Sequence, residues 1–208
     1  MQGAVMTGSR DRLRRRALSQ RRGLALGDRF AWSRSIQARA TSLPCYCAAR
    51  FVALYSPVQN EVDTQVILDH ALASGKKVFF PKLNQTGSSR FAQVNSSADL
   101  IAGRFGILEP VGTDAMAPAD GDRSIIFVPG VLFDRQGMRL GRGGGWYDRV
   151  LSELGSHGIF VGLAYEFQIV GSLPAESWDQ RVHFIITEKN QIDCGIAPHE
   201  SQGMSRFL

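Results

Sequence analysis

From residue 50 onward, short apolar runs rich in β-branched and aromatic residues alternate with segments of helical spacing. The run RFVALYSP at 50–57 predicts a buried strand, and KKVFFP at 76–81 predicts the next one. Between them, Asn60 and Asp63 resemble a helix-capping pair, and apolar residues keep helical spacing up to Gly75. An exposed strand or hairpin is expected at 90–94. Further strands are expected at 123–130, 158–165 and 182–189, with a short helix at 147–155. Short strand–helix–strand connections favour parallel strands, so the pattern predicts an α/β domain.

The first 50 residues differ from the rest in being helical in pattern and strongly basic. They contain eleven arginines, no lysine and only two acids, Asp11 and Asp28, whereas the rest of the chain has a small excess of acids. Helices are predicted at 10–24 and at 29–43, the second capped by Asp28 and ended by Pro44. A basic arm on a mildly acidic body favours an anionic partner, either nucleic acid or a small molecule with phosphates and carboxylates.

The 208 residues are enough for one domain with a substantial core. We expect a single domain over 1–208 with three layers, α/β/α, and a largely parallel central sheet. A basic helical segment should form the arm at 1–50, and 190–208 should be a flexible tail. No apolar run is long enough to span a membrane, and the basic start lacks the apolar core of a secretory signal, so we expect a cytoplasmic protein.

In open α/β sheets, ligands bind beyond the carboxyl ends of the strands. Three polar loops are expected at such ends, at 55–61, 141–148 and 165–180. The second belongs to the stretch RLGRGGGWYD, whose glycines would let backbone N–H groups converge on an anion beside a helix N-terminus. Arg139 and Arg142 favour phosphate there. The stretch matches neither GxxxxGK[ST] nor GxGxxG, so a plain tight connection stays open as the alternative.

Acidic and aromatic residues accompany these loops. Asp148 and Asp179 are candidate Mg²⁺ ligands, because Mg²⁺ is commonly bound by one or two carboxylates plus phosphate oxygens. The alternatives are a helix N-terminal charge for Asp148 and a turn residue for Asp179. Glu61 could likewise be a first-turn acid of its helix. Trp146 and Tyr147 could stack on a flat heterocycle.

Together these motifs resemble the 5-formyltetrahydrofolate cyclo-ligase family, also called 5,10-methenyltetrahydrofolate synthetases. The resemblance rests on RDRLR at 10–14, YSPVQNEVDT at 55–64, FVPGVLFDRQGMRLGRGGGWYD at 127–148 and PAESWDQRVHFIITE at 174–188. Three residues depart from the family pattern. Trp146 stands where Tyr is usual, Gly144 where Lys or another larger residue is frequent, and Arg10 where Lys is usual.

The resemblance implies an ATP- and Mg²⁺-dependent enzyme that cyclises 5-formyltetrahydrofolate to 5,10-methenyltetrahydrofolate with release of ADP and phosphate. Asp148 and Asp179 would bind Mg²⁺, and Tyr147 and Arg142 would act in catalysis. The substrate would contact Ser56, Glu61 and Tyr147, and its glutamate tail, single or polyglutamylated, would account for the basic arm. The implied ATP-binding residues are Arg10, Arg14, Arg139, Leu140, Gly141, Arg142, Gly143, Gly144, Gly145, Trp146 and Tyr147.

Two other functions are compatible with parts of the sequence. A nucleic-acid-binding protein could use the Arg-rich arm, although the motif at 139–148 would then have no explanation. A family member could also have kept the ATP site and lost cyclo-ligase activity, against which Glu61 and Tyr147 argue.

Overall fold

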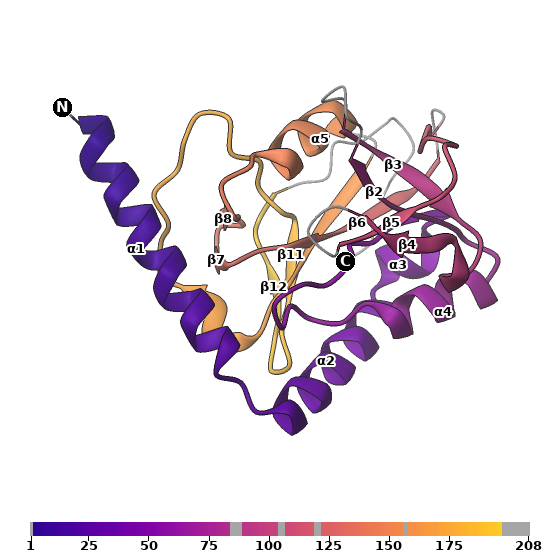
Figure 1. Cartoon of the computed structure of the whole chain (residues 1–208), viewed down its shortest axis with the longest axis horizontal. Helices are drawn as coiled ribbons and strands as arrows, with labels where there is room; N and C mark the ends of the chain where they lie inside the picture. The colour runs from indigo at the N-terminus through magenta and orange to yellow at the C-terminus, as the bar shows by residue number, and fades with distance from the viewer. Residues whose placement is uncertain (1, 84–88, 104–106, 119–121, 156–157, 197–208) are drawn as a thin grey trace.

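The computed structural model describes residues 2–83, 89–103, 107–118, 122–155 and 158–196, and it has a seven-stranded sheet at its centre (Figure 1). The strand order is β12-β11-β9-β6-β1-β2-β3. Neighbours from β11 to β2 run parallel, whereas the edge strands β3 and β12 pair antiparallel. The strands are β1 Phe51–Ala53, β2 Lys77–Leu83, β3 Ser89–Val94, β6 Ser124–Pro129, β9 Gly158–Leu163, β11 Phe184–Ile186 and β12 Gln191–Asp193.

Helices cover both faces of this sheet (Figure 1). On one face lie α2 (Leu26–Thr41), α3 (Pro44–Ala48) and α4 (Gln65–Ala73), and on the other lies α5 (Trp146–Leu154). The first face buries Ile125 and Phe127 of β6 against α2 and α4, and the second buries Ile126 of β6 against α5. This alternation along a continuously apolar strand follows from the two-residue period of β structure. The prediction of three layers with a largely parallel sheet is confirmed.

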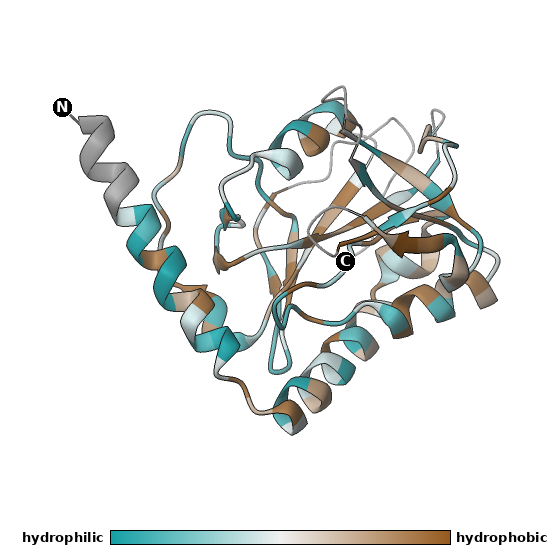
Figure 2. Ribbon diagram, in the orientation of Figure 1, coloured by the Kyte–Doolittle hydropathy of each residue, from teal (hydrophilic) through white to brown (hydrophobic). Residues whose placement is uncertain are grey.

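Helix α1 (Gln2–Arg22) lies along one side of the molecule, against a smaller sheet (Figure 1). That sheet has the order β10-β7-β8, with bounds Ile169–Val170, Leu132–Asp134 and Arg139–Leu140. Ala17 of α1 packs with Leu132 and Leu140, while the part of the helix that is coloured in Figure 2 is mostly hydrophilic. A separate hairpin consists of β4 (Leu100–Ala102) and β5 (Leu108–Pro110), and short 3₁₀ turns occupy Ser97–Asp99 and Glu166–Gln168.

The predicted helix starts are wrong at two places. Helix α4 begins at Gln65 after the cap residue Thr64, so Asn60 and Asp63 do not form a capping pair; Oδ1 of Asp63 alone accepts the N–H of Gln65, at 2.8 Å. Asn60 instead adopts a left-handed conformation with φ 60°, which places Glu61 in an irregular loop. Helix α2 begins at Leu26, and Asp28 lies in its first turn rather than at its cap.

Two further expectations need correction. The strand at 90–94 pairs antiparallel with β2, as a hairpin would, but it is not exposed. Phe91, Ala92 and Val94 are buried, with Phe91 packed edge-on against Trp146 of α5. The segment after residue 190 is not wholly a flexible tail, since β12 pairs with β11. Residues 197–208 lie outside the described part of the chain. Among the described helices, none has the length and apolar character needed to cross a membrane.

Candidate functional site

A cavity of about 310 Å³ lies beyond the carboxyl ends of β1 and β6. Its walls come from α1, the loop after β1, β2, the β4–β5 hairpin, the glycine-rich loop with the start of α5, and the loop before β11. The predicted residues that line it are Arg10, Arg14, Ser56, Glu61, Arg139, Gly141, Arg142, Gly143, Gly144, Gly145, Trp146, Tyr147 and Asp148. The structure therefore brings together three sequence motifs that are far apart in the chain.

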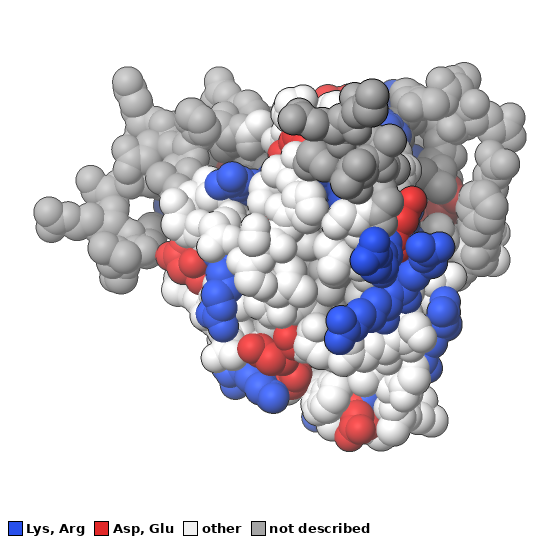
Figure 3. Space-filling model, turned by 90° about the vertical axis from the view of Figure 1, so that its left-hand side faces the viewer, with Lys and Arg blue, Asp and Glu red and all other residues white. Residues whose placement is uncertain are grey.

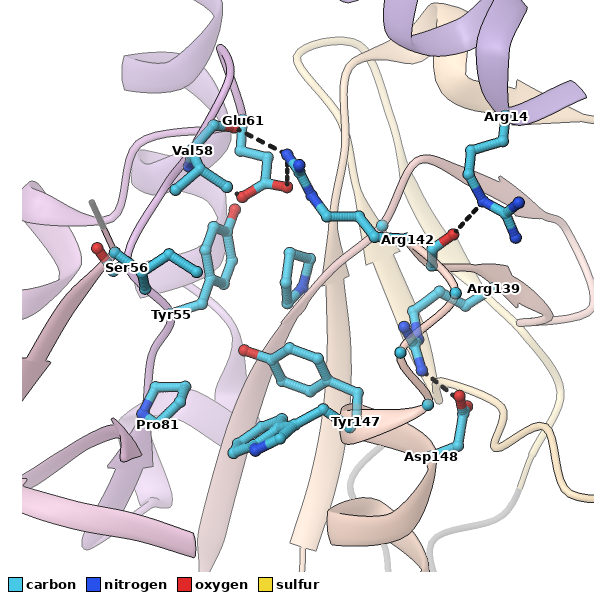
Figure 4. Close-up of a pocket in the computed structure, with 18 of the residues that line it drawn as sticks. Arg14, Tyr55, Ser56, Val58, Glu61, Pro81, Arg139, Arg142, Tyr147 and Asp148 are labelled. Atoms are coloured by element: carbon cyan, nitrogen blue, oxygen red, sulfur yellow. Dashed lines mark hydrogen bonds and ion pairs between the residues drawn. The ribbon is translucent and has the colours of Figure 1, made fainter. Parts of the chain in front are cut away.

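Glu61 is a buried carboxylate in the wall formed by the loop after β1 (Figure 4). Its Oε1 accepts hydrogen bonds from Nη2 of Arg21 at 3.3 Å and from Nη2 of Arg142 at 3.2 Å. Its Oε2 accepts a hydrogen bond from the backbone N–H of Val58 at 3.1 Å. Both oxygens of this buried carboxylate therefore have N–H partners, and their remaining lone pairs can accept hydrogen bonds from a ligand.

The glycine-rich loop connects β8 to α5 with two backbone conformations that favour glycine. Gly143 has φ 104°, and Gly145, with φ 62°, is the N-cap residue of α5. The first turn of α5 lines the cavity, and the leading N–H groups of a helix lack intrahelical partners. From α1, Nε of Arg14 donates to the carbonyl oxygen of Gly141 at 2.9 Å, and Arg14 also pairs with Asp11. The arrangement suits an anionic ligand.

Tyr147 reaches from α5 toward the wall that contains Tyr55 and Pro81 (Figure 4). The guanidinium of Arg139 lies 5.5 Å from the centre of its ring and also bonds Asp148. Burial raises the pKa of Tyr147 well above its ordinary value, and the nearby Glu61 carboxylate raises it further, against an opposing effect of Arg139. The phenol is therefore neutral at physiological pH and can act as a hydrogen-bond donor, not as a base.

The two candidate metal ligands have different surroundings. Asp148 lines the cavity, and its Oδ1 accepts hydrogen bonds from Arg139 at 2.7 Å and from the backbone N–H of Gln180 at 3.2 Å. Asp179 does not line the cavity. Both of its oxygens accept hydrogen bonds from Arg10, at 2.8 and 3.3 Å, and one also accepts the N–H of Glu176. Within the described ranges, no group of three or more His, Cys, Asp or Glu side chains could hold a metal.

Three predicted site residues also have contacts within the fold. The Oγ of Ser56 accepts the backbone N–H of Leu108 at 3.0 Å and so fastens the β4–β5 hairpin to the loop after β1. Leu140 is buried against Ala17 in the cluster beneath α1 and does not line the cavity. Trp146 lines the cavity and meets the Tyr147 ring edge-on, with 4.7 Å between ring centres.

Several cavity residues carried no sequence signal. Ile107 and Glu109 come from the β4–β5 hairpin, which the sequence did not predict, and Trp178 lines the rim with an exposed ring. Tyr55 lies in the loop predicted at 55–61 and begins the motif YSPVQNEVDT, but no role in a site was predicted for it. Its buried hydroxyl donates to the carbonyl oxygen of Val62 at 2.9 Å, and burial raises its pKa well above the usual value.

The arginines of the basic arm divide into two groups. Arg10, Arg14, Arg21 and Arg29 bond to other parts of the protein. On the face that carries α1, Lys and Arg side chains gather beside scattered acidic ones (Figure 3). The exposed α1 arginines include Arg12, Arg15, Arg16 and Arg22. Part of the basic charge that suggested nucleic acid therefore serves the fold and the cavity.

Comparisons with known proteins agree on one family. The model of the 5-formyltetrahydrofolate cyclo-ligase family matches residues 6–188. The 5-formyltetrahydrofolate cyclo-ligase of Escherichia coli K12 is 31% identical over 180 residues, which are 85% of this chain and 95% of that protein. The Haemophilus influenzae protein of the same name is 30% identical over 177 residues, which are 83% of this chain and 94% of that protein.

Solved structures agree with the sequence comparisons. The 5,10-methenyltetrahydrofolate synthetase of Aquifex aeolicus is 34% identical, covers 94% of this chain and 99% of its own, and superposes with a TM-score of 0.77. A Mycoplasma pneumoniae protein at 24% identity shares the fold with a TM-score of 0.69, over 86% of this chain and 98% of its own.

Proposed function

The chain belongs to the 5-formyltetrahydrofolate cyclo-ligase family, and we propose that it is the enzyme that uses ATP and Mg²⁺ to convert 5-formyltetrahydrofolate to 5,10-methenyltetrahydrofolate. The proposal rests on one observation: a loop suited to anions and a buried carboxylate line the same cavity. The loop at 141–148 suits the phosphates of ATP, and Glu61 suits the N–H groups at the donor edge of a pterin.

The reaction needs an activated formyl oxygen, because that oxygen is a poor leaving group until it is phosphorylated. The formyl oxygen attacks the γ-phosphorus of ATP, the bond to the bridging oxygen breaks, and ADP leaves. N10 then attacks the activated carbon and loses its proton, and phosphate departs with the former formyl oxygen. Phosphoryl transfer of this kind depends mainly on positioning and charge neutralisation, so no protein nucleophile is needed.

The side chains divide this work between the two ligands. Arg10, Arg14 and the glycine-rich loop would hold the phosphates, and Asp179 would orient Arg10 through their paired hydrogen bonds. Arg142 would turn from Glu61 to the transferred phosphoryl group. The neutral hydroxyl of Tyr147 would face the reacting carbons as a donor, and the wall near Ser56 would contact the folate.

Asp148 fits a Mg²⁺ ion better than Asp179 does. Its contacts among the described residues fall on Oδ1, and Mg²⁺ commonly takes one or two carboxylates with phosphate and water oxygens. Bound there, Mg²⁺ would neutralise charge on the phosphates. Asp179 could serve as a second ligand only if Arg10 released it.

The exposed arginines of α1 lie on the helix that also contributes Arg10 and Arg14 to the cavity. We propose that this face attracts the carboxylates of the folate glutamate tail, including those of polyglutamylated substrate.

Binding measurements on the Glu61→Gln variant test the proposal. Loss of one partner of a buried charge pair costs about 2 kcal/mol or more, so the Kd for 5-formyltetrahydrofolate should rise at least about thirtyfold, with little change for ATP. Asp63→Asn is the matched control, since Asp63 is an exposed carboxylate of the same loop. The proposal fails if the wild-type protein binds neither ligand, or if Glu61→Gln binds the folate as tightly as wild type.

A further inference from the structure

Among the charged residues of the described ranges, Arg21 has the lowest exposure, at 1% for the whole residue, and no motif of the sequence pointed to it. Each nitrogen of its guanidinium is used. Nε donates to the carbonyl oxygen of Gln59 at 3.1 Å, Nη1 to that of Gly130 at 3.1 Å, and Nη2 to Oε1 of Glu61 at 3.3 Å. Burial lowers the pKa of Arg21, and the Glu61 carboxylate opposes that effect. A buried guanidinium is costly, so its complete set of partners indicates a specific task.

Those partners tie together three parts of the cavity. Gln59 and Glu61 lie in the loop after β1, and Gly130 follows the carboxyl end of β6. Arg21 itself lies in the last turn of α1, the helix whose Arg14 bonds to the glycine-rich loop. One side chain therefore fixes the loop of Glu61 relative to β6 and to the helix that contacts the glycine-rich loop.

The two arginines on Glu61 are not equivalent. The side chain of Arg142 is 39% exposed and that of Arg21 only 2%. Arg142 is also part of the glycine-rich loop, so a bound phosphate can draw it away. Arg21 cannot leave without breaking three hydrogen bonds inside the protein.

We propose that Arg21 is the positioning residue of Glu61: it keeps that carboxylate oriented toward the folate after Arg142 has turned to phosphate. The inference rests on the proposed function, because it takes Glu61 to be the folate-binding carboxylate. Arg21 does not line the cavity and acts only through Glu61.

The test compares Arg21→Met with Gln168→Leu. Gln168 is equally buried and also donates to the carbonyl oxygen of Gly130, at 3.0 Å, but it does not touch Glu61. Arg21→Met should raise the Kd for 5-formyltetrahydrofolate about tenfold or more, the value of one charged hydrogen bond, and leave the Kd for ATP nearly unchanged. Gln168→Leu should leave both constants near wild type, even where it lowers the thermal midpoint. An equal rise in folate Kd for both variants would overturn the proposal.

Combined variants keep the inference testable if Arg21→Met folds poorly. Arg21→Lys retains the charge and should raise the folate Kd less than Arg21→Met. Where Glu61→Gln is already present, adding Arg21→Met should weaken folate binding no further, because the two residues act as one unit. Additive losses would contradict a role exerted through Glu61.

A separate readout distinguishes this inference from the proposed function. If the wild-type protein does not bind 5-formyltetrahydrofolate at all, the proposed function fails. A crystal structure of Arg21→Lys or Arg21→Met then decides the positioning role alone. A displaced Glu61 carboxylate would support the role, and an unmoved one would overturn it.

Discussion

Arg142 and Glu61, 81 residues apart in the chain, join opposite walls of the cavity through a hydrogen bond of 3.2 Å from Nη2 to Oε1 (Figure 4). The bond occupies Oε1 of the carboxylate proposed to bind the folate, and it holds the guanidinium proposed to bind phosphate. If both ligands bind as proposed, each would release a group that the other ligand uses.

We predict that the two ligands bind cooperatively through Arg142. A non-hydrolysable ATP analogue should strengthen binding of 5-formyltetrahydrofolate by about fivefold or more, the usual range of such coupling. In Arg142→Met the coupling should be largely lost. Oε1 of Glu61 then has no bond to residue 142, so the ATP analogue has no such bond to break. Calorimetric titration of the folate with and without the analogue measures this coupling. Arg149→Met is the control, since Arg149 is an exposed arginine next to the same loop. Full coupling in Arg142→Met would refute the prediction.

Asp148→Asn and Asp179→Asn should fail in different ways. Asp148→Asn should abolish Mg²⁺-dependent turnover, since the amide is a poor ligand for this hard cation. Asp179→Asn should raise the KM for ATP by loosening Arg10, with the Mg²⁺ concentration for half-maximal rate unchanged. Initial rates over a matrix of ATP and Mg²⁺ concentrations separate the two effects. A shift of the Mg²⁺ requirement in Asp179→Asn would instead make Asp179 a metal ligand.

Neighbouring glycines of the loop should respond differently to alanine. Gly143 has φ 104°, where a side chain is strained, whereas Gly144 has an unstrained φ and open space around the position of a Cβ. Gly143→Ala should cost about 1–2 kcal/mol and weaken ATP binding. Gly144→Ala should be tolerated, and Gly144→Lys should strengthen ATP binding by adding a cation beside the phosphates. Equal effects of the two alanine substitutions on ATP affinity would contradict this account of the loop.

His183 should make stability depend on pH. Burial lowers the pKa of its ring, whose Nδ1 accepts the N–H of Phe160 at 2.9 Å, so the folded protein holds the neutral form. Below pH of about 6.5, the unfolded chain binds a proton that the folded chain does not, and stability falls as the pH falls. His183→Gln can still accept the Phe160 N–H but does not titrate. Its free energy of unfolding should therefore change less between pH 7 and about 5.5 than that of wild type; equal slopes would refute the assignment.

The sequence predicted the parts of this molecule that local chemistry determines. Apolar runs such as 123–130 located the central strands, and strand-end placement brought Glu61, Gly143 and Tyr147 to one cavity. Residues that act through distant contacts were not predictable in this way. Arg21 looks like any other arginine of a basic helix, and its role depends on where α1 packs.

Local signals were also overridden where tertiary structure imposed another conformation. Asn60 and Asp63 have the spacing of a cap, but the left-handed backbone of Gln59 and Asn60 delays α4 until Gln65. The contacts of Asp179 also depend on a distant element, because α1 places Arg10 against both of its oxygens; its role as a metal ligand stays a prediction.

Turnover of 5-formyltetrahydrofolate by the purified protein is the decisive measurement for the proposed activity. Absorbance of the 5,10-methenyl product should appear only when ATP and Mg²⁺ are both present, with one ADP released for each product molecule. No product under these conditions, with tight binding of RNA at physiological salt, would contradict it and favour a nucleic-acid-binding protein.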